Sequence, residues 1–325
     1  MDLATGFTFG PATPTPTGPP LPLPLPLPGP ADPGAPTPSA VDPNADLGLL
    51  EKLQGQWKGT GFNAIWRPSS VTQDRFLELN VTEETLEFTR IPGNIPNRGL
   101  LQADLFMTGL RYLQQISDAN LHAGLHIEPG LWLSIPATTN PPVQASVARL
   151  ASIPHGTTIV AQGGAFSVAG PPRINPVDLN PFPIGNPGGN FTFPEQNLAS
   201  VSVFRTPPAG LVGITQAMVD DPNSVLTSAI SGQTITETIV LQVTTSATPI
   251  LGGGTANTAF LAGSTDGPNA DAALVTATFW IETVDGAPMQ LQYTQTVLLN
   301  FNTLSWPHVT VATLHKTYPT AAEPA

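Results

Sequence analysis

The sequence predicts an all-β chain that folds as an antiparallel, closed β-barrel of about ten or more strands. Apolar and polar residues alternate at a period of two through much of the chain, as they do in half-buried strands. Short turns rich in Gly, Pro, Asn and Asp separate these runs, and the 38 prolines and 30 glycines leave little room for long helices. Closing the sheet removes the exposed edges that so many strands would otherwise leave.

The composition excludes several classes of function. Only 10% of the 325 residues are charged, against about 25% in an average globular protein, while 40% are hydrophobic, which suffices for a sizeable core. The net charge of −12 and the lack of a basic cluster argue against nucleic-acid binding. The chain has no cysteine, so disulfides and thiolate chemistry are excluded and any metal must be held by His or carboxylate.

The segment 1–44 is expected to be a disordered, Pro-rich N-terminal tail. Its Leu-Pro repeat over 21–28 favours extended polyproline II, which cannot bury a core. A plain linker and a motif that docks on a partner protein both remain open. The first basic residue is Lys52, so the positive region of a secretory signal is absent, and no run of about 20 apolar residues follows. We therefore expect a cytoplasmic protein without a membrane span.

Folded sequence is expected from Asp46, because four leucines within 47–53 are spaced for a short apolar turn. The alternation is clearest over 233–243, where apolar residues from Ile235 to Val243 share one face and threonines share the other. Comparable runs bounded by turn residues predict the remaining strands. These lie at 56–66, 72–80, 84–91, 100–107, 110–117, 121–135, 145–153, 157–163, 199–205, 273–284, 289–300 and 307–316.

One helix and the domain boundaries complete the expected organisation. Asp221 as N-cap, Pro222 at the first helical position and Gly232 as the stop predict one short helix. The Pro- and Gly-rich stretch 167–198 is typical of a long loop. The expected divisions are the tail at 1–44, a single barrel domain over 45–318 with an insertion at about 166–272, and a C-terminal tail at 319–325.

His126 and Glu128 on one predicted strand are candidate binding residues. His126 and Glu128 are two apart on one face of a predicted strand, so their Cα atoms lie about 6.5 Å apart and the pair could act together around a ligand or a proton. A plain structural pair at a strand end is the alternative. His122 lies about 13 Å from His126 along the strand, too far to share a metal ion. His155 falls in a turn and is expected at the barrel rim or in solvent.

His308 opens the last predicted strand and is the candidate for binding a flat ligand in the barrel mouth. On a strand it shares a face with Thr310, Ala312 and Leu314, small or apolar residues that suit an inward-facing side. His315 falls on the opposite face. A histidine with a purely structural role remains the alternative at position 308.

Three motifs occur in a fixed order along the chain. They are the opening Gly55-Gln-Trp57-Lys-Gly-Thr-Gly61, the strand His126-Ile-Glu128-Pro-Gly130 followed by Arg149, and the closing Trp306-Pro-His308. Together they resemble the Gly-x-Trp-x-Gly-x-Gly, His-x-Glu-x-Gly and C-terminal histidine motifs of the nitrobindin-type heme-binding barrels. These are calycin-like proteins related to fatty-acid-binding proteins and lipocalins.

The resemblance implies a barrel that binds heme b, with His308 as the proximal ligand of the iron. It further implies that such a heme binds nitric oxide and isomerises peroxynitrite to nitrate. His126, Glu128, Trp57 and Arg149 would then organise the barrel or its pocket, although Trp57 suits the apolar core at the closed end and Arg149 suits an ion pair. The alternative is a lipocalin-like carrier of a small hydrophobic molecule without heme, in which the insertion fills the heme site.

Overall fold

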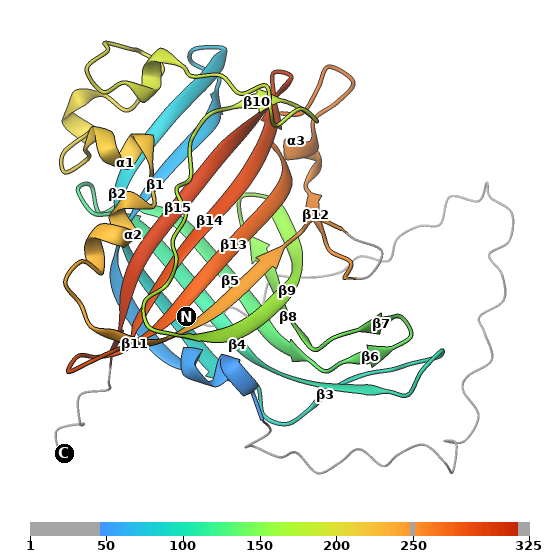
Figure 1. The fold of residues 1–325 in the computed structure, drawn as a ribbon. Coiled ribbons are helices and arrows are strands. Elements are labelled where there is room, and N and C mark those ends of the chain that lie inside the picture. Colours follow the sequence, from blue (N-terminus) through green and yellow to red (C-terminus); the bar gives the residue numbers. More distant parts are fainter. Residues whose placement is uncertain (1–45, 248–250, 318–325) are drawn as a thin grey trace, which may run out of the picture. The chain divides into compact units, whose positions relative to one another are not determined.

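Ten antiparallel strands close into a barrel in the computed structural model, which describes residues 46–247 and 251–317 (Figure 1). Neighbouring strands pair in chain order around the wall, and the last strand pairs back with the first, from Gln56 opposite Thr317 to Ile65 opposite His308. This closure confirms the predicted fold. The predicted tails at 1–44 and 319–325 lie outside the described residues. The barrel strands are β1 Gly55–Ser69, β2 Asp74–Arg90, β4 Leu105–Asp118, β5 Gly124–Ile135, β8 Ser146–Ile153, β9 Thr157–Ala169, β11 Ile235–Thr244, β13 Asp271–Val284, β14 Gln290–Phe301 and β15 Leu304–Thr317.

Short strands and helical turns lie outside the ten barrel strands. The short strands are β3 Ile95–Asn97, β6 Thr138–Thr139, β7 Pro142–Val143, β10 Phe182–Pro183 and β12 Gly254–Asn257. The helical turns are η1 Gly48–Leu53, η2 Pro194–Gln196, η3 Pro208–Gly210, α1 Gln216–Asp220, α2 Ser224–Ala229 and α3 Ala259–Ala262. Within the described ranges, none of these helices has the length and apolar character needed to cross a membrane.

The apolar turn predicted at 47–53 is η1, and it plugs one end of the barrel. Leu50 and Leu53 are fully buried there beside Trp57. The indole Nε1 of Trp57 donates a hydrogen bond of 2.7 Å to the carbonyl oxygen of Leu53, so the plug is fixed to the start of β1. Trp57 is therefore part of the closed, apolar end of the barrel.

The glycines of the opening and central motifs are needed because side chains or backbone lie against them. A Cβ at Gly61 would come within 2.3 Å of the carbonyl oxygen of Val311 on β15. A Cβ at Gly130 would come within 2.6 Å of the ring of Tyr112. Both distances are far below normal contact, so these positions accept only glycine in this wall.

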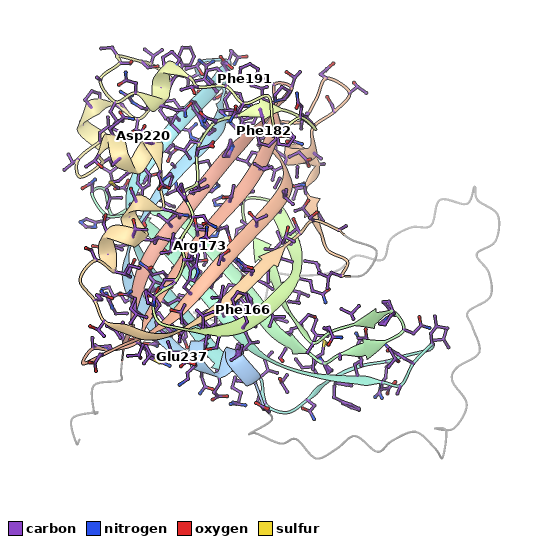
Figure 2. The ribbon with its side chains drawn as sticks, viewed as in Figure 1. Phe166, Arg173, Phe182, Phe191, Asp220 and Glu237 are labelled. Atoms are coloured by element: carbon purple, nitrogen blue, oxygen red, sulfur yellow. The ribbon has the colours of Figure 1, made fainter. Side chains whose placement is uncertain are left out.

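A second core lies outside the barrel wall. The segment 170–232 between β9 and β11 crosses the outer face of the sheet, and Figure 2 shows Arg173 and Asp220 along it. The indole Nε1 of Trp66 donates a 2.8 Å hydrogen bond to the carbonyl oxygen of Leu179, which is fully buried. Trp306 stacks on Phe301 at a ring-centroid distance of 4.9 Å in the same core. This covering segment therefore packs on the outside of the barrel and leaves the interior free.

Several local details differ from the sequence prediction. The segment 199–205, expected as a strand, is irregular, because Val201 and Val203 are exposed and the guanidinium of Arg205 donates to the carbonyl oxygens of Glu195, Asn197 and Ser200. The runs 72–80 and 84–91 form the single strand β2. The helix expected after Asp221 begins at Ser224, and α1 precedes it with Thr215 as its N-cap. The strand predicted over 233–243 is β11, which pairs with β9 and β13 in the barrel wall.

Candidate functional site

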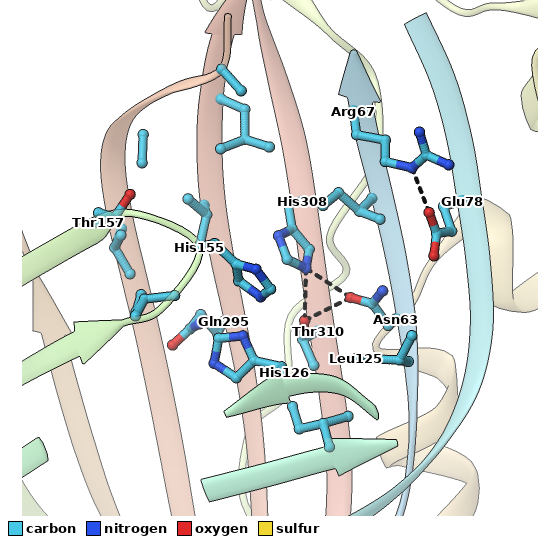
Figure 3. Close-up of a pocket in the computed structure, with 18 of the residues that line it drawn as sticks. Asn63, Arg67, Glu78, Leu125, His126, His155, Thr157, Gln295, His308 and Thr310 are labelled. Atoms are coloured by element: carbon cyan, nitrogen blue, oxygen red, sulfur yellow. Dashed lines mark hydrogen bonds and ion pairs between the residues drawn. The ribbon is translucent and has the colours of Figure 1, made fainter. Parts of the chain in front are cut away.

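A cavity of about 320 Å³ opens inside the barrel, beyond the buried end that η1 closes. This volume lies at the lower end of the range typical of small-molecule sites, about 300 to 1,000 Å³. Much of the wall is apolar and includes Ile65, Val297 and Leu299. Three histidines, His126, His155 and His308, line the same space, and Figure 3 shows their rings facing it. The cavity thus combines apolar walls with a few groups that can hold a polar atom.

His308 reaches the cavity because the alternation along β15 points residues 308, 310, 312 and 314 inward and residues 309 and 311 into the outer core. Its Nε2 lies 2.7 Å from Oδ1 of Asn63 and 3.2 Å from Oγ1 of Thr310 (Figure 3). The inward orientation expected for this histidine is what the structure has.

The imidazole of His308 is uncharged at neutral pH. Burial is the main cause, and the neighbouring His126 and His155 add to it, so that the pKa of His308 falls to about 3. A neutral imidazole keeps one nitrogen lone pair available, which is the form that binds a metal ion or accepts a hydrogen bond.

His126 on β5 and His155 in the β8–β9 turn meet across the opening of the barrel. Their ring centroids are 5.3 Å apart, and both residues also line a second, shallower pocket on the outside. Burial, followed by the proximity of His126, lowers the pKa of His155. His155 is exposed at the rim, where the turn position predicted it. The backbone pairing between β5 and β8 stops at Gly130. Beyond that point, the contact between His126 and His155 links β5 to the turn that follows β8.

Glu128 and Arg149 form a fully buried ion pair beneath the cavity. Nη2 of Arg149 lies 2.5 Å from Oε1 of Glu128, and the hydroxyl of Tyr112 donates to the same carboxylate. Burial alone would favour the neutral acid, but Arg149, His126 and Tyr112 outweigh it and hold the pKa of Glu128 at about 2. The other carboxylate oxygen lies 3.2 Å from Nε2 of His126. Neither Glu128 nor Arg149 lines the cavity, and they act on it through the residues they hold.

The sequence analysis missed a second buried acid in the same layer. Glu84 on β2 accepts hydrogen bonds from the hydroxyls of Tyr293 at 2.6 Å and Thr82 at 3.0 Å. Burial raises the pKa of Glu84 to about 7, although these hydrogen bonds and that of Gln114 oppose the rise. Tyr293 and Gln114 line the cavity floor, so Glu84 is one hydrogen bond away from it. Glu84 lies on the same face of β2 as the core residues Leu86 and Phe88, and this alternation in the sequence could have identified it as buried.

The predicted site residues thus separate into three places. His308 and His126 line the cavity, Glu128 and Arg149 lie below it, and Trp57 lies in the closed end, outside the cavity lining. Across residues 46–247 and 251–317, no group of three or more His, Asp or Glu side chains is arranged to hold a metal ion by itself.

Comparisons with known proteins do not assign a function to the cavity. No protein-family model matches the chain, and no curated protein matches it either. Among solved structures, Rv2717c from M. tuberculosis is similar over 84% of this chain and 100% of its own, at 16% sequence identity and a TM-score of 0.39. The function of the cavity is therefore inferred from its own residues.

Proposed function

We propose that the cavity binds heme b and that His308 is the axial ligand of the iron. One observation carries this proposal: β15 presents an uncharged imidazole to an apolar cavity inside a closed barrel. A b-type heme needs little more than one such axial bond and apolar surroundings for the porphyrin. The sequence resemblance supports the same assignment.

The donor set fits this group. The Nε2 hydrogen of His308 has an acceptor 2.7 Å away in Asn63, so the lone pair available to the cavity is on Nδ1. Histidines that bind metal ions usually donate their other N–H to a fixed partner in this way, which sets the tautomer and strengthens the ligand. The apolar side chains of Ile65, Val297 and Leu299 line the same cavity and suit a porphyrin surface.

The remaining polar residues have definite tasks in this proposal. His126 and His155 supply hydrogen-bonding groups at the opening of the cavity, where a small molecule would enter. Glu128 holds the position of His126 through its free carboxylate oxygen. When bound, heme would supply an iron with one open coordination position for nitric oxide or peroxynitrite, the ligands that the resemblance implies.

Titration of the purified chain with hemin tests the proposal. We expect the wild type to give a sharpened Soret band with saturable binding, and His308→Ala to lose most of that affinity. His315→Ala is the matched control, because His315 lies on the same strand but is exposed. The absence of a Soret change in the wild type, or equal binding by His308→Ala, would contradict the heme assignment.

A carrier of a small apolar molecule without heme is the second candidate. It is favoured by the modest cavity of about 320 Å³. A fluorescent apolar probe distinguishes the two functions. If the probe binds with a stoichiometry of one and excess hemin does not displace it, the carrier function replaces the heme function.

A further inference from the structure

A continuous chain of hydrogen bonds runs from His308 across four strands. Oδ1 of Asn63 lies 2.7 Å from Nε2 of His308, and the amide nitrogen of Asn63 donates to Oδ1 of Asn80 at 3.2 Å. The amide nitrogen of Asn80 then donates to Oδ2 of Asp118 at 2.9 Å. Asn63 and Asn80, the two side chains between His308 and Asp118, are buried.

The direction of this chain is fixed by Asp118. An ionised carboxylate only accepts hydrogen bonds, and the other oxygen of Asp118 accepts the backbone N–H groups of Asn120 and Leu121, each at 2.8 Å. Asn80 must therefore turn its NH₂ group toward Asp118 and its oxygen toward Asn63. In turn, Asn63 must present its oxygen to the imidazole.

Thr310 also requires Nε2 of His308 to carry a hydrogen. Its hydroxyl donates its only hydrogen to Oδ1 of Asn63 at 3.0 Å, so toward Nε2 of His308, 3.2 Å away, it can only accept. Both neighbours of Nε2 are then acceptors, and Nε2 must carry the hydrogen. Within the described residues, no group donates to Nδ1, so its lone pair is available on the cavity side.

We propose that Asp118, Asn80 and Asn63 act as a positioning chain that holds His308 in the Nε2–H tautomer and makes the cavity select ligands that bind a lone pair. Such ligands carry a Lewis-acidic metal centre or a hydrogen-bond donor, whereas a carboxylate, which only accepts, is disfavoured at His308. This inference rests on the proposed function in one respect, that the cavity is a binding site.

The tautomer can be read without any ligand. We expect ¹⁵N NMR of histidine-labelled wild type to show His308 as a single Nε2–H tautomer at neutral pH. Asp118→Asn should shift His308 to the Nδ1–H tautomer, because the backbone N–H groups of Asn120 and Leu121 keep the amide oxygen on their side and leave its NH₂ group facing Asn80, which reverses the chain. Asp285→Asn, at an exposed turn, is the matched control and should match the wild type.

A rescue variant separates positioning from general structural damage. In the double variant Asn63→Asp with Asp118→Asn, the carboxylate of Asp at position 63 accepts directly from Nε2 of His308. The Nε2–H tautomer of the wild type should therefore return. An Nδ1–H tautomer in the wild type, or an unchanged spectrum in Asp118→Asn, would overturn the proposal.

Ligand selection is tested with two probes that share the naphthalene ring, 1-naphthol and 1-naphthoate, together with hemin. We expect the wild type to bind 1-naphthol in preference to 1-naphthoate, and Asp118→Asn to bind hemin or 1-naphthol about 10-fold more weakly. Equal binding of the two naphthalene probes would refute the selection. If the tautomer behaves as expected but no probe binds the wild type, the positioning chain stands and the proposed binding function fails.

Discussion

Two buried glutamates inside the barrel have pKa values shifted in opposite directions by their neighbours. Glu128 lies against the guanidinium of Arg149, so its pKa falls to about 2 in spite of burial. Glu84 has no cation among its hydrogen-bond partners, and burial raises its pKa to about 7. The presence of a cation beside Glu128, and of hydroxyls and an amide alone beside Glu84, therefore decides the direction in which each pKa shifts.

The raised pKa of Glu84 predicts a specific dependence of stability on pH. Because its pKa is higher in the folded chain than the ordinary 4.5, its contribution is fully present below pH 4.5 and is lost as the pH rises through about 7. We expect Glu84→Gln to remove this loss, and so to gain up to roughly 3 kcal/mol relative to the wild type between pH 4.5 and pH 8. Urea unfolding at several pH values measures the difference.

Glu87→Gln is the control for this measurement, because Glu87 lies on the same strand and is exposed. It should leave the pH profile of the wild type unchanged. Parallel profiles for the wild type and Glu84→Gln would show that Glu84 is charged in the folded chain at neutral pH.

At the scale of elements, the part of β1 over residues 61–66 is largely buried on both faces, and the strand belongs to two cores. Its inward residues Asn63 and Ile65 line the cavity, while Trp66 packs outward under the covering segment 170–232. A strand buried on both faces loses the strict alternation that marks a half-buried strand. The outer core therefore stabilises the same strand that carries the partner of His308.

The outer core predicts a large effect of a substitution far from the cavity. Leu179 is fully buried against Trp66, and its replacement by Ala leaves a cavity there. We expect Leu179→Ala to lower the free energy of unfolding by about 2 to 5 kcal/mol, and Val201→Ala, at an exposed site, to change it by less than about 0.5 kcal/mol. Urea unfolding followed by tryptophan fluorescence checks both values. A change in Leu179→Ala as small as in Val201→Ala would mean that the covering segment is not part of the cooperative structure.

The sequence predicted the barrel but not its cover, for a physical reason. Alternation within one strand is a local property, so β11 and β15 could be recognised from neighbouring residues alone. The covering segment has no regular period, and the partners Trp66 and Leu179 are 113 positions apart. Such contacts depend on the tertiary arrangement and leave no local pattern.

The same distinction applies to the candidate site. His308, and the pair His126 and Glu128, were identified because their inward orientation follows from parity along a single strand. Asn63 and Asp118 were missed, because they meet His308 only through the pairing of different strands. Their residue types are unremarkable on their own, and only the closed barrel brings them together.

At the scale of the whole molecule, closure depends on the seam between β1 and β15. Asn63 lies opposite Thr310 in this seam, so the pairing that closes the barrel also assembles the acceptors around His308. Gly61, two residues before Asn63, lies opposite Ala312, which is two residues after Thr310. Damage to the seam should therefore remove stability and binding together.

Gly61→Val tests this coupling. A Cβ at this position would lie 2.3 Å from the carbonyl oxygen of Val311 and 2.8 Å from Oγ1 of Thr82, so β1 and β15 must separate. We expect the free energy of unfolding to fall by more than about 4 kcal/mol and binding of 1-naphthol or hemin to be lost. Gly164→Val on β9 is the matched control, because a Cβ there meets no atom within 4 Å, and it should keep both properties. Far-UV circular dichroism during urea unfolding, together with probe titration, measures both. Loss of stability in Gly61→Val with unchanged binding would show that the site does not depend on closure at this seam.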